Sequence, residues 1–521
     1  MSHKRTLLLN GNSLTPKQVN AIVRGDITEI RIDPAALRRV RETHRAFERT
    51  AAENQVYGLH TGFGSRATVL IDQNTDRYSS IVNTGSFSNI FDFVDPSVSK
   101  AVLAIKANSF LAGGMGAVRP ELIEKLVEVF NDNNFRSMPN VPALGTGEGD
   151  LNSSAILAKW WLDKHPDFHL APGEDLALLA GNDYCDALMA VTLSEIRRLM
   201  DISYSVFGAS MEGYRAQPQA IAPQVAEARP SNSLRTSIKC INGVMKDSRL
   251  LETGARNLQD PNSFRTFPQV MAAVENYTSK LEKYLQQEMN SATQNPYYSA
   301  DSDQIIHNGN FDTTYSSVTL SALQLALAKH ADISFKRLSK MCDPHFNGRL
   351  VPGLSRPNSL ADNIQSLNVT NIAGQALKNV VGHARQNITD ASSLQFQNGI
   401  EDSVSGVFQQ LLDAQAMVKN IRLVMACELV VAMATIQERI RDGDIVEGDL
   451  SPHIARIYEN FMQSIDISRT TDRSGMGFDL DQVTALFDNR DIFPPTPHLA
   501  DRKLLHVEQL AGRTGQEAGR A

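Results

Sequence analysis

The segment Leu144–Leu151 combines a glycine-rich backbone with acidic side chains, and it is the first place to look for chemistry. Its sequence is Leu-Gly-Thr-Gly-Glu-Gly-Asp-Leu, so three of five consecutive residues from Gly145 are glycine. Glycine lets the backbone adopt positive φ angles or approach another group closely. Asp150 also suits the start of the helix expected after the turn, because a negative charge there interacts favourably with the helix dipole. Glu148 has no such explanation.

A second glycine-punctuated loop carries a phenol and an imidazole. It reads Tyr57-Gly-Leu-His60-Thr-Gly-Phe-Gly64, and such a loop can expose both rings. Tyr57 could act as a base near neutral pH only if its pKa were depressed.

Metal and phosphate sites are not supported by the sequence. His165 and His169 are four residues apart, but Pro166 between them argues against a shared helical face, and there is no HExxH motif. Glu148, Asp150 and Asn152 are spaced as in a calcium loop, but the terminal glutamate that such a loop needs is missing, because Trp161 stands there. The glycine-rich turn lacks the lysine of a phosphate-binding loop. We expect no metal.

Composition indicates a soluble globular protein of 521 residues with 42% hydrophobic and 21% charged residues. The net charge of −7 gives no overall basic field for nucleic acid or for an anionic membrane. No apolar run approaches the roughly 20 residues of a membrane-spanning helix. The four cysteines are far apart, without a CxxC pair, which suits a reducing compartment. We therefore expect a cytoplasmic protein.

Hydrophobic periodicity predicts a mainly α fold with a small α+β region at the N-terminus. Leu7–Leu9 and Ile30–Ile32 alternate as strands, and Thr15 and Asp33 are expected to cap helices. Longer helical patterns follow at residues 97–113, 119–133, 153–164, 186–214, 266–293, 316–339, 369–384 and 404–440. A helix of about 35 residues would span roughly 50 Å, which is typical of the rods of a long bundle. We expect three regions, at residues 1–195, 196–450 and 451–521.

Several further motifs occur in a fixed order along the chain. Besides the Tyr57–Gly64 loop they are Leu14-Thr15 with Val23-Arg24-Gly25, Val118-Arg119-Pro120-Glu121, Gln259-Asp260-Pro261 with Ser263 and Arg265, Pro268-Gln269-Val270, Asn290-Ser291, Thr293, Asn295-Pro296, Gly309-Asn310-Phe311 and Glu401-Asp402. From Leu7 to about Asp402 this series resembles the histidine/phenylalanine (aromatic amino acid) ammonia-lyase family.

The resemblance implies a long-helix bundle of the aromatic ammonia-lyase or fumarase/aspartase type, assembled as a homotetramer. Each active site of that family draws loops from three subunits. The resemblance also implies that Tyr57 is the catalytic base, that Arg265 clamps the carboxylate of a small-molecule substrate, and that Asn310 orients it.

The family makes its electrophile, 4-methylideneimidazole-5-one, from Ala-Ser-Gly within Gly-Ala-Ser-Gly-Asp-Leu. In the register set by Asp150-Leu151 this chain has Gly147-Glu148-Gly149. Glutamate has no β-leaving group and cannot yield the methylidene. A second register, Gly145-Thr146-Gly147, could in principle dehydrate to an ethylidene analogue. We expect that no such cofactor is present.

Other departures from the family lie around the electrophile and the substrate ring. The family's Asn-Gly-Thr aligns with Ala180-Gly181-Asn182, its Asp-Pro-Tyr-Ser tyrosine with Asn262, and its Ser-His pair with Asn83-Thr84. The histidine of Asn-Phe-His becomes Asp312, and a helix glutamate falls near Ala384. A decayed or repurposed site explains these changes together.

Three hypotheses follow. The first is an enzyme without the electrophile, in which Glu148 acts as acid or ammonium partner and His60, Thr84 and Asn262 contact the substrate. The second is a non-catalytic homologue that partners or regulates an active paralogue. The third is a conventional ammonia-lyase with a cofactor built from Gly145-Thr146-Gly147.

Overall fold

The structure is a computed structural model, and it describes residues 5–71, 95–113, 115–132, 165, 167–253, 255–348, 369–385, 397–464 and 480–496. Helices dominate these residues, and strands occur only as two short pairs. The expected mainly α fold is therefore confirmed.

The chain forms two compact units, each assembled from separated segments. The first contains Met1–Glu195, Tyr277–Ala322 and Ala384–Gln415, and the second contains the remainder. The expected division into three consecutive regions stays a prediction.

The N-terminal part of the first unit is the expected α+β region. Strand β1 (Thr6–Leu9) pairs in parallel with β2 (Glu29–Ile32), and helix α1 (Pro16–Val23) connects them. Parallel strands need such a crossover. Thr15 caps α1 through a capping box with Gln18, and Asp33 caps α2 (Pro34–Glu53), so both predicted caps are confirmed.

The first unit also contains several shorter elements. They are η1 (Gly64–Arg66), α4 (Pro96–Leu111), α5 (Pro120–Asn131), α7 (Glu174–Leu179), β3 (Tyr297–Ser299), β4 (Gln304–Ile306) and η6 (Gln397–Gly399). Helix α4 is buried on nearly every face, so its polar side chains need partners inside the protein. The antiparallel pair β3–β4 was not anticipated from the sequence, because its strands have only three residues each.

Four long helices run through both units. They are α8 (Asp183–Tyr214), α13 (Phe267–Glu288), α14 (Thr314–Cys342) and α18 (Val407–Arg441). They match the predicted rods, with small shifts at the ends that have local causes. Gly406, at a φ of 67°, precedes the first residue of α18, and α13 ends before the Asn290–Pro296 turn.

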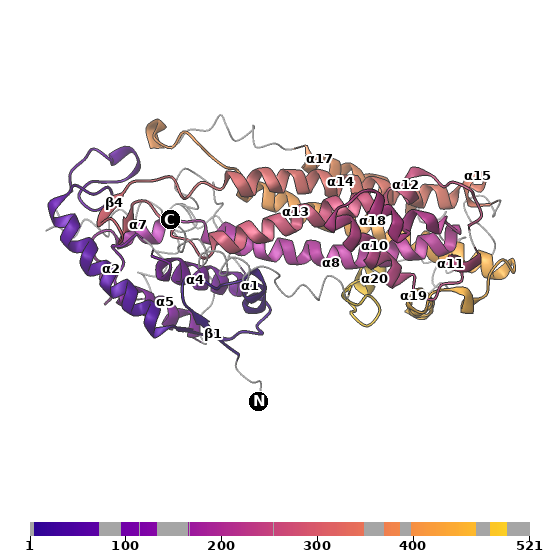
Figure 1. Cartoon of the computed structure of the whole chain (residues 1–521), viewed down its shortest axis with the longest axis horizontal. Coiled ribbons are helices and arrows are strands. Elements are labelled where there is room, and N and C mark those ends of the chain that lie inside the picture. Colours follow the sequence, from indigo (N-terminus) through magenta and orange to yellow (C-terminus); the bar gives the residue numbers. More distant parts are fainter. Residues whose placement is uncertain are drawn as a thin grey trace, which may run out of the picture. The chain divides into compact units, whose positions relative to one another are not determined.

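The second unit surrounds its part of these rods with shorter helices. They are η3 (Pro218–Ile221), α9 (Pro223–Ala228), α10 (Asn232–Val244), α11 (Leu250–Thr253), α12 (Asn262–Arg265), α15 (Pro344–Asn347), α17 (Val369–Ala384), η7 (Glu447–Asp449), α19 (Pro452–Ser464) and α20 (Leu480–Leu486). Figure 1 shows α14 and α17 running alongside each other within this unit.

A buried ion pair joins three of the rods in the second unit. The Arg337 guanidinium on α14 donates to both carboxylate oxygens of Glu428 on α18, at 2.6 and 2.9 Å. Ser210 on α8 donates to the same carboxylate at 2.7 Å, and Ser334 donates to its other oxygen. The side chains of the pair are 1% and 0% exposed. Such a buried charge is tolerated because it is paired and fully hydrogen-bonded.

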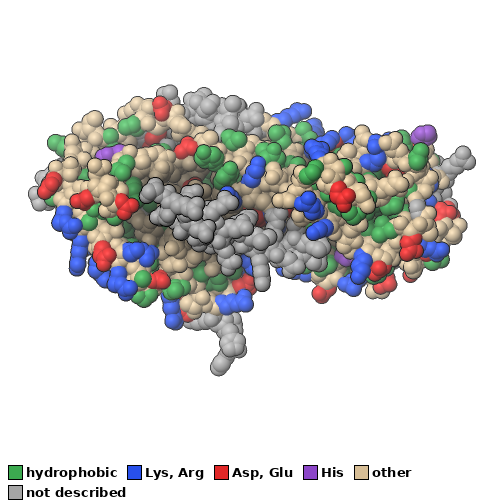
Figure 2. Space-filling view, in the orientation of Figure 1, with side chains coloured by type: hydrophobic (Ala, Val, Ile, Leu, Met, Phe, Trp, Pro, Cys, Tyr) green, Lys and Arg blue, Asp and Glu red, His purple; other side chains and the backbone are tan. Residues whose placement is uncertain are grey.

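Charged side chains of both signs are interspersed over the described surface shown in Figure 2. None of the helices in the described ranges combines the length and apolarity needed to cross a lipid bilayer.

We predict that Arg337→Met destabilises the protein by about 3–5 kcal/mol, because it leaves the Glu428 carboxylate buried and uncompensated. The matched control is Arg249→Met. Arg249 is 61% exposed and pairs with Asp449 at 2.9 Å, so its loss should cost about 0–1 kcal/mol. Chemical denaturation at fixed protein concentration measures the free energy of unfolding of both variants. Equal losses would show that the buried pair contributes no more to stability than the exposed pair.

Candidate functional site

The loop that follows α2 holds Tyr57 in a fixed position. The Gly64 N–H donates to the Tyr57 hydroxyl oxygen at 2.8 Å, and the Tyr57 side chain is half-buried. A bridge between Thr61 and Leu70 closes the loop, with the Ile71 N–H donating to the His60 carbonyl at 3.0 Å. The phenol oxygen is therefore presented by a closed, hydrogen-bonded loop.

Two features of the structure favour glycine at position 58, directly after Tyr57. Gly58 has a φ of 73°, in the left-handed region. A Cβ atom added to Gly58 would also lie 2.1 Å from the Leu176 side chain on α7. The tip of the tyrosine loop therefore packs directly against α7.

His60, expected from the sequence to contact substrate, has one ring nitrogen committed to the loop. Its Nδ1 accepts a hydrogen bond from the Val56 N–H at 3.0 Å. Burial lowers the pKa of His60 below its ordinary value, so the ring is neutral near pH 7 and carries its proton on Nε2. Only Nε2 is left to donate to a ligand.

His307 lies against Tyr57 and was missed in the sequence. Its Nε2 accepts from the Tyr57 N–H at 3.3 Å, and the two rings meet edge to face, with centroids 6.4 Å apart. The only sequence signal was its position three residues before Asn310. The segment that carries both residues leads from β4 to α14.

The same segment is anchored to the turn that opens α8. The Asn182 amide donates to the Phe311 carbonyl at 3.0 Å, and the Asn310 N–H donates to the Asn308 side chain at 2.8 Å. The Asn310 side chain is exposed. The structure thus brings the Tyr57 loop and the Asn310 segment together, through His307.

Glu288, at the end of α13, is a second residue that the sequence did not single out. Burial raises its pKa to about 7; the charge of Asp312 adds to this shift, and a hydrogen bond with Asn182 opposes it. Its Oε2 has no hydrogen-bond partner among the described residues. Glu288 therefore changes charge near neutral pH beside the Asn310 segment.

A buried lysine holds the turn where the family's Asn-Gly-Thr aligns. Lys106 Nζ donates to the Ala180 carbonyl at 2.7 Å and lies 2.5 Å from Asp183 Oδ2. A Cβ added to Gly181 would lie 2.9 Å from that carboxylate oxygen and 3.3 Å from Nζ. The side-chain amide that the family's asparagine provides at the first position of this turn is absent, because this chain has Ala180 there.

Arg265 and Asn262 lie together on α12 in the second unit. Arg265 Nε donates to the Asp260 carbonyl at 2.8 Å, and its Nη2 donates to the Asn262 side chain at 2.6 Å. Asn262, expected to contact substrate, thus holds the guanidinium. Among the described residues, these bonds leave Nη1 and one edge of the guanidinium for a ligand.

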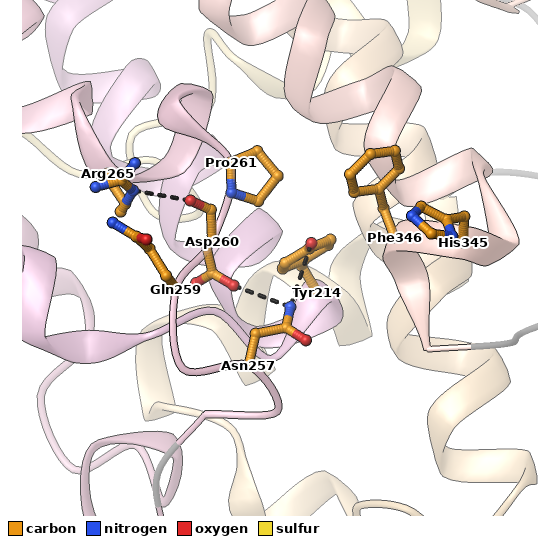
Figure 3. A pocket seen from close by; sticks show the side chains of 8 residues that line it. All are labelled: Tyr214, Asn257, Gln259, Asp260, Pro261, Arg265, His345 and Phe346. Atoms are coloured by element: carbon orange, nitrogen blue, oxygen red, sulfur yellow. Dashed lines mark hydrogen bonds between the residues drawn. The ribbon is translucent and has the colours of Figure 1, made fainter.

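Arg265 borders a cavity of about 410 Å³. The lining residues, shown in Figure 3, are Tyr214, Asn257, Gln259, Asp260, Pro261, Arg265, His345 and Phe346. Asp260 is buried, and it accepts from the Asn257 amide at 3.1 Å and from the Gln217 N–H. The cavity therefore combines the Arg265 guanidinium and the Asp260 carboxylate with aromatic and amide side chains.

The remaining candidate residues lie outside the described residues. They are Thr84, Gly145, Thr146, Gly147 and Glu148. Within the part of the chain that the structure describes, no group of three or more His, Cys, Asp and Glu side chains is placed to hold a metal ion.

The fold and the ordered motifs define an aromatic amino acid lyase. The family model described as "Aromatic amino acid lyase" matches residues 14–163 and 162–463. The chain belongs to this family, and the expected enzyme class, a lyase, is confirmed.

Among curated relatives, the histidine ammonia-lyase of Caldanaerobacter subterraneus subsp. tengcongensis is 26% identical, over 84% of this chain and 89% of that protein. Among solved structures, ergothionase from Treponema denticola, an ergothioneine-degrading enzyme, is similar with a TM-score of 0.82 and 20% identity, over 94% of this chain and 99% of that one. Tyrosine aminomutase from Streptomyces globisporus follows with a TM-score of 0.78 and 18% identity, over 94% of this chain and 98% of that one.

We predict that Gly58→Ala lowers the melting temperature, because the left-handed backbone alone costs about 1–2 kcal/mol for a residue with a Cβ and the contact with Leu176 adds to that cost. Gly243→Ala is the control. Gly243 is in α10, has no positive φ, and has no atom within 4 Å of an added Cβ, so its substitution should be neutral or stabilising. Equal melting temperatures for wild type and Gly58→Ala would contradict the described packing of the loop on α7.

Proposed function

We propose that the chain is an ammonia-lyase-fold enzyme that works without 4-methylideneimidazole-5-one. It catalyses elimination, addition or isomerisation on a small amino or carboxylic acid. The observation that carries the proposal is Glu148, which stands where the family has the serine that is dehydrated. A glutamate side chain cannot become the methylidene.

The turn that aligns with the family's Asn-Gly-Thr does not fit the family's prosthetic group either. The turn that would support it has Ala180 in place of asparagine. The Ala180 carbonyl accepts from Lys106, whose charge is balanced by Asp183. An ammonium–carboxylate pair at this turn supports a changed centre rather than an intact electrophile site.

Tyr57 is the proposed base. The Gly64 N–H donates to the phenol oxygen, which would carry negative charge once the tyrosine has lost its proton. A hydrogen bond to the charged form favours that form. The closed loop also fixes the oxygen, and a general base must lie within hydrogen-bond reach of the proton it removes.

Arg265 is the proposed clamp for the substrate carboxylate, with Asn310 as a second contact. The bonds from Arg265 to Asp260 and Asn262 orient the guanidinium before a ligand arrives, which reduces the cost of ordering on binding. We further propose a homotetramer in which Tyr57 and Arg265 of different subunits meet. His60, Thr84 and Asn262 complete the substrate contacts.

The leaving nitrogen must depart without the electrophile's help. A quaternary ammonium group can leave in this way. Ergothioneine, which one of the structural neighbours degrades, carries a trimethylammonium group. A primary amine can do it once it is protonated. Glu148 is the proposed partner of this cationic nitrogen.

The mass of the intact protein tests the absence of the prosthetic group. We expect the mass calculated from the sequence, because neither Glu148 nor Thr146 is dehydrated. Loss of two water molecules would contradict this and would favour a cofactor built from Gly145-Thr146-Gly147. Mass spectrometry of the purified protein measures the difference directly.

A Tyr57→Phe variant tests the base. We expect it to lower kcat by about 10²–10⁴-fold, the usual contribution of a general base, with little change in substrate binding. Activity is measured on histidine, tyrosine, phenylalanine and ergothioneine. Tyr458→Phe, in α19, is the control and should behave as wild type. If neither wild type nor the variants turn over or are stabilised by any of these acids, a non-catalytic partner role is favoured.

A further inference from the structure

His307 is an imidazole beside the proposed base, and the proposed mechanism does not use it. It directly follows strand β4 and is exposed. Its Nε2 accepts a hydrogen bond from the Tyr57 N–H at 3.3 Å, and its ring meets the phenol ring edge to face, with 6.4 Å between the centroids. These contacts are with the backbone and the ring of Tyr57, so His307 acts on the position of the tyrosine.

The hairpin that leads to His307 is docked on the helix that leads to the tyrosine loop. The turn between β3 and β4 carries Asp303, whose Oδ1 accepts from the Thr50 hydroxyl on α2 at 2.9 Å and from the Tyr298 hydroxyl at 2.5 Å. The Phe47 ring on α2 also meets the Tyr298 ring edge to face, with centroids 6.3 Å apart. Helix α2 and the hairpin therefore form one frame.

Little chain separates this frame from the contact between the two rings. Tyr57 follows the last residue of α2 by four positions, and His307 directly follows the last residue of β4. Beyond His307 the chain is held again, because the Asn308 N–H donates to the Asn295 side chain at 2.9 Å. The hydrogen bond from tyrosine backbone to imidazole is thus built by two anchored segments.

The His307 contact restrains the backbone end of Tyr57. At the other end, the Gly64 N–H donates to the phenol oxygen at 2.8 Å. The amide before Tyr57 is held in a similar way, since the Val56 N–H donates to His60 Nδ1 at 3.0 Å. An imidazole nitrogen accepts such a bond only while it carries no proton. Two neutral imidazoles therefore fix consecutive amides at the start of the loop.

His307 also joins the base to one of the proposed carboxylate contacts. It lies three positions before Asn310, whose N–H donates to the Asn308 side chain at 2.8 Å. The next residue is held as well, because the Asn182 amide donates to the Phe311 carbonyl at 3.0 Å. The segment that supports the backbone of Tyr57 is therefore itself fixed to the start of α8.

We propose that His307 is a positioning residue for the Tyr57 base, and that its unprotonated Nε2 fixes the tyrosine backbone against the segment that carries Asn310. The inference rests on the proposed function, because His307 affects catalysis only through Tyr57. In this role it transfers no proton and touches no reacting atom. A base that is held in place lowers the entropic part of the barrier. Loss of the acceptor should therefore slow the chemical step and leave carboxylate binding, which is assigned to Arg265, unchanged.

Two variants separate the hydrogen bond from the ring contact. His307→Phe keeps an aromatic ring without an acceptor, whereas His307→Gln keeps an acceptor without the ring. We expect His307→Phe to lower kcat by about 3- to 10-fold, the kinetic equivalent of one hydrogen bond, at unchanged KM. We expect His307→Gln to restore most of this loss. Both are measured with histidine, tyrosine, phenylalanine and ergothioneine as substrates.

Hydrogen–deuterium exchange tests the same contact without any substrate. The Tyr57 N–H should exchange faster in His307→Phe than in wild type, because it has lost its acceptor. In His307→Gln it should exchange at the wild-type rate. Mass spectrometry of overlapping peptides around Tyr57 measures these rates.

His169→Phe is the matched control. His169 is exposed and belongs to the same unit, so its substitution should leave kcat, KM and the exchange of the Tyr57 N–H unchanged. Thermal melting of all variants separates misfolding from a local effect on the tyrosine.

A folded, active His307→Phe with wild-type kcat or wild-type exchange overturns the positioning role and leaves the proposed function standing. A His307→Gln as slow as His307→Phe overturns it too, and so does a rise in KM at unchanged kcat. The proposed function is tested separately by Tyr57→Phe. Absence of turnover and of ligand stabilisation in every protein overturns both proposals.

Discussion

The buried charge of Glu428 is the constraint on which the second unit depends. Once a carboxylate is placed at 0% exposure between long helices, its partners must come from those helices. Arg337 supplies them, and it also donates to the Ser263 carbonyl at 3.0 Å. Ser263 lies on α12, two residues before Arg265. The ion pair that joins the rods therefore also fixes the short helix that carries the proposed carboxylate clamp.

In the first unit the candidate residues are positioned differently, because they lie on loops rather than on the long helices. The Tyr57 loop gains its order from packing on α7, where Gly58 adopts a φ of 73° and lies against the Leu176 side chain. The Asn310 segment gains its order from Asn182, at the start of α8. Loops positioned by a rigid scaffold commonly carry function. Here the scaffold consists of one short helix and the first turn of one long helix.

Much of the fold could be predicted because it depends on local signals. Thr15 and Asp33 cap helices through contacts within three residues, and the periodicity of α17 gives its bounds of Val369–Ala384. The site could be predicted only where its motifs are contiguous, as at Tyr57–Gly64. His307 is found only through packing, since it lies 250 positions from Tyr57.

The departures of this chain from the family can be understood from the electrostatics of the site. An electrophile is a permanent electron sink that needs no proton, whereas an acid works only while it stays neutral. Replacing the first by the second therefore requires a carboxyl group in an apolar setting, away from compensating cations. Asp175 is a buried carboxyl group on α7, and the two cations Lys106 and Arg119 of the same unit are paired with Asp183 and Glu174. Burial is the main cause that raises the pKa of the Asp175 carboxyl group to about 7, so this group keeps its proton to a higher pH than an exposed aspartic acid does.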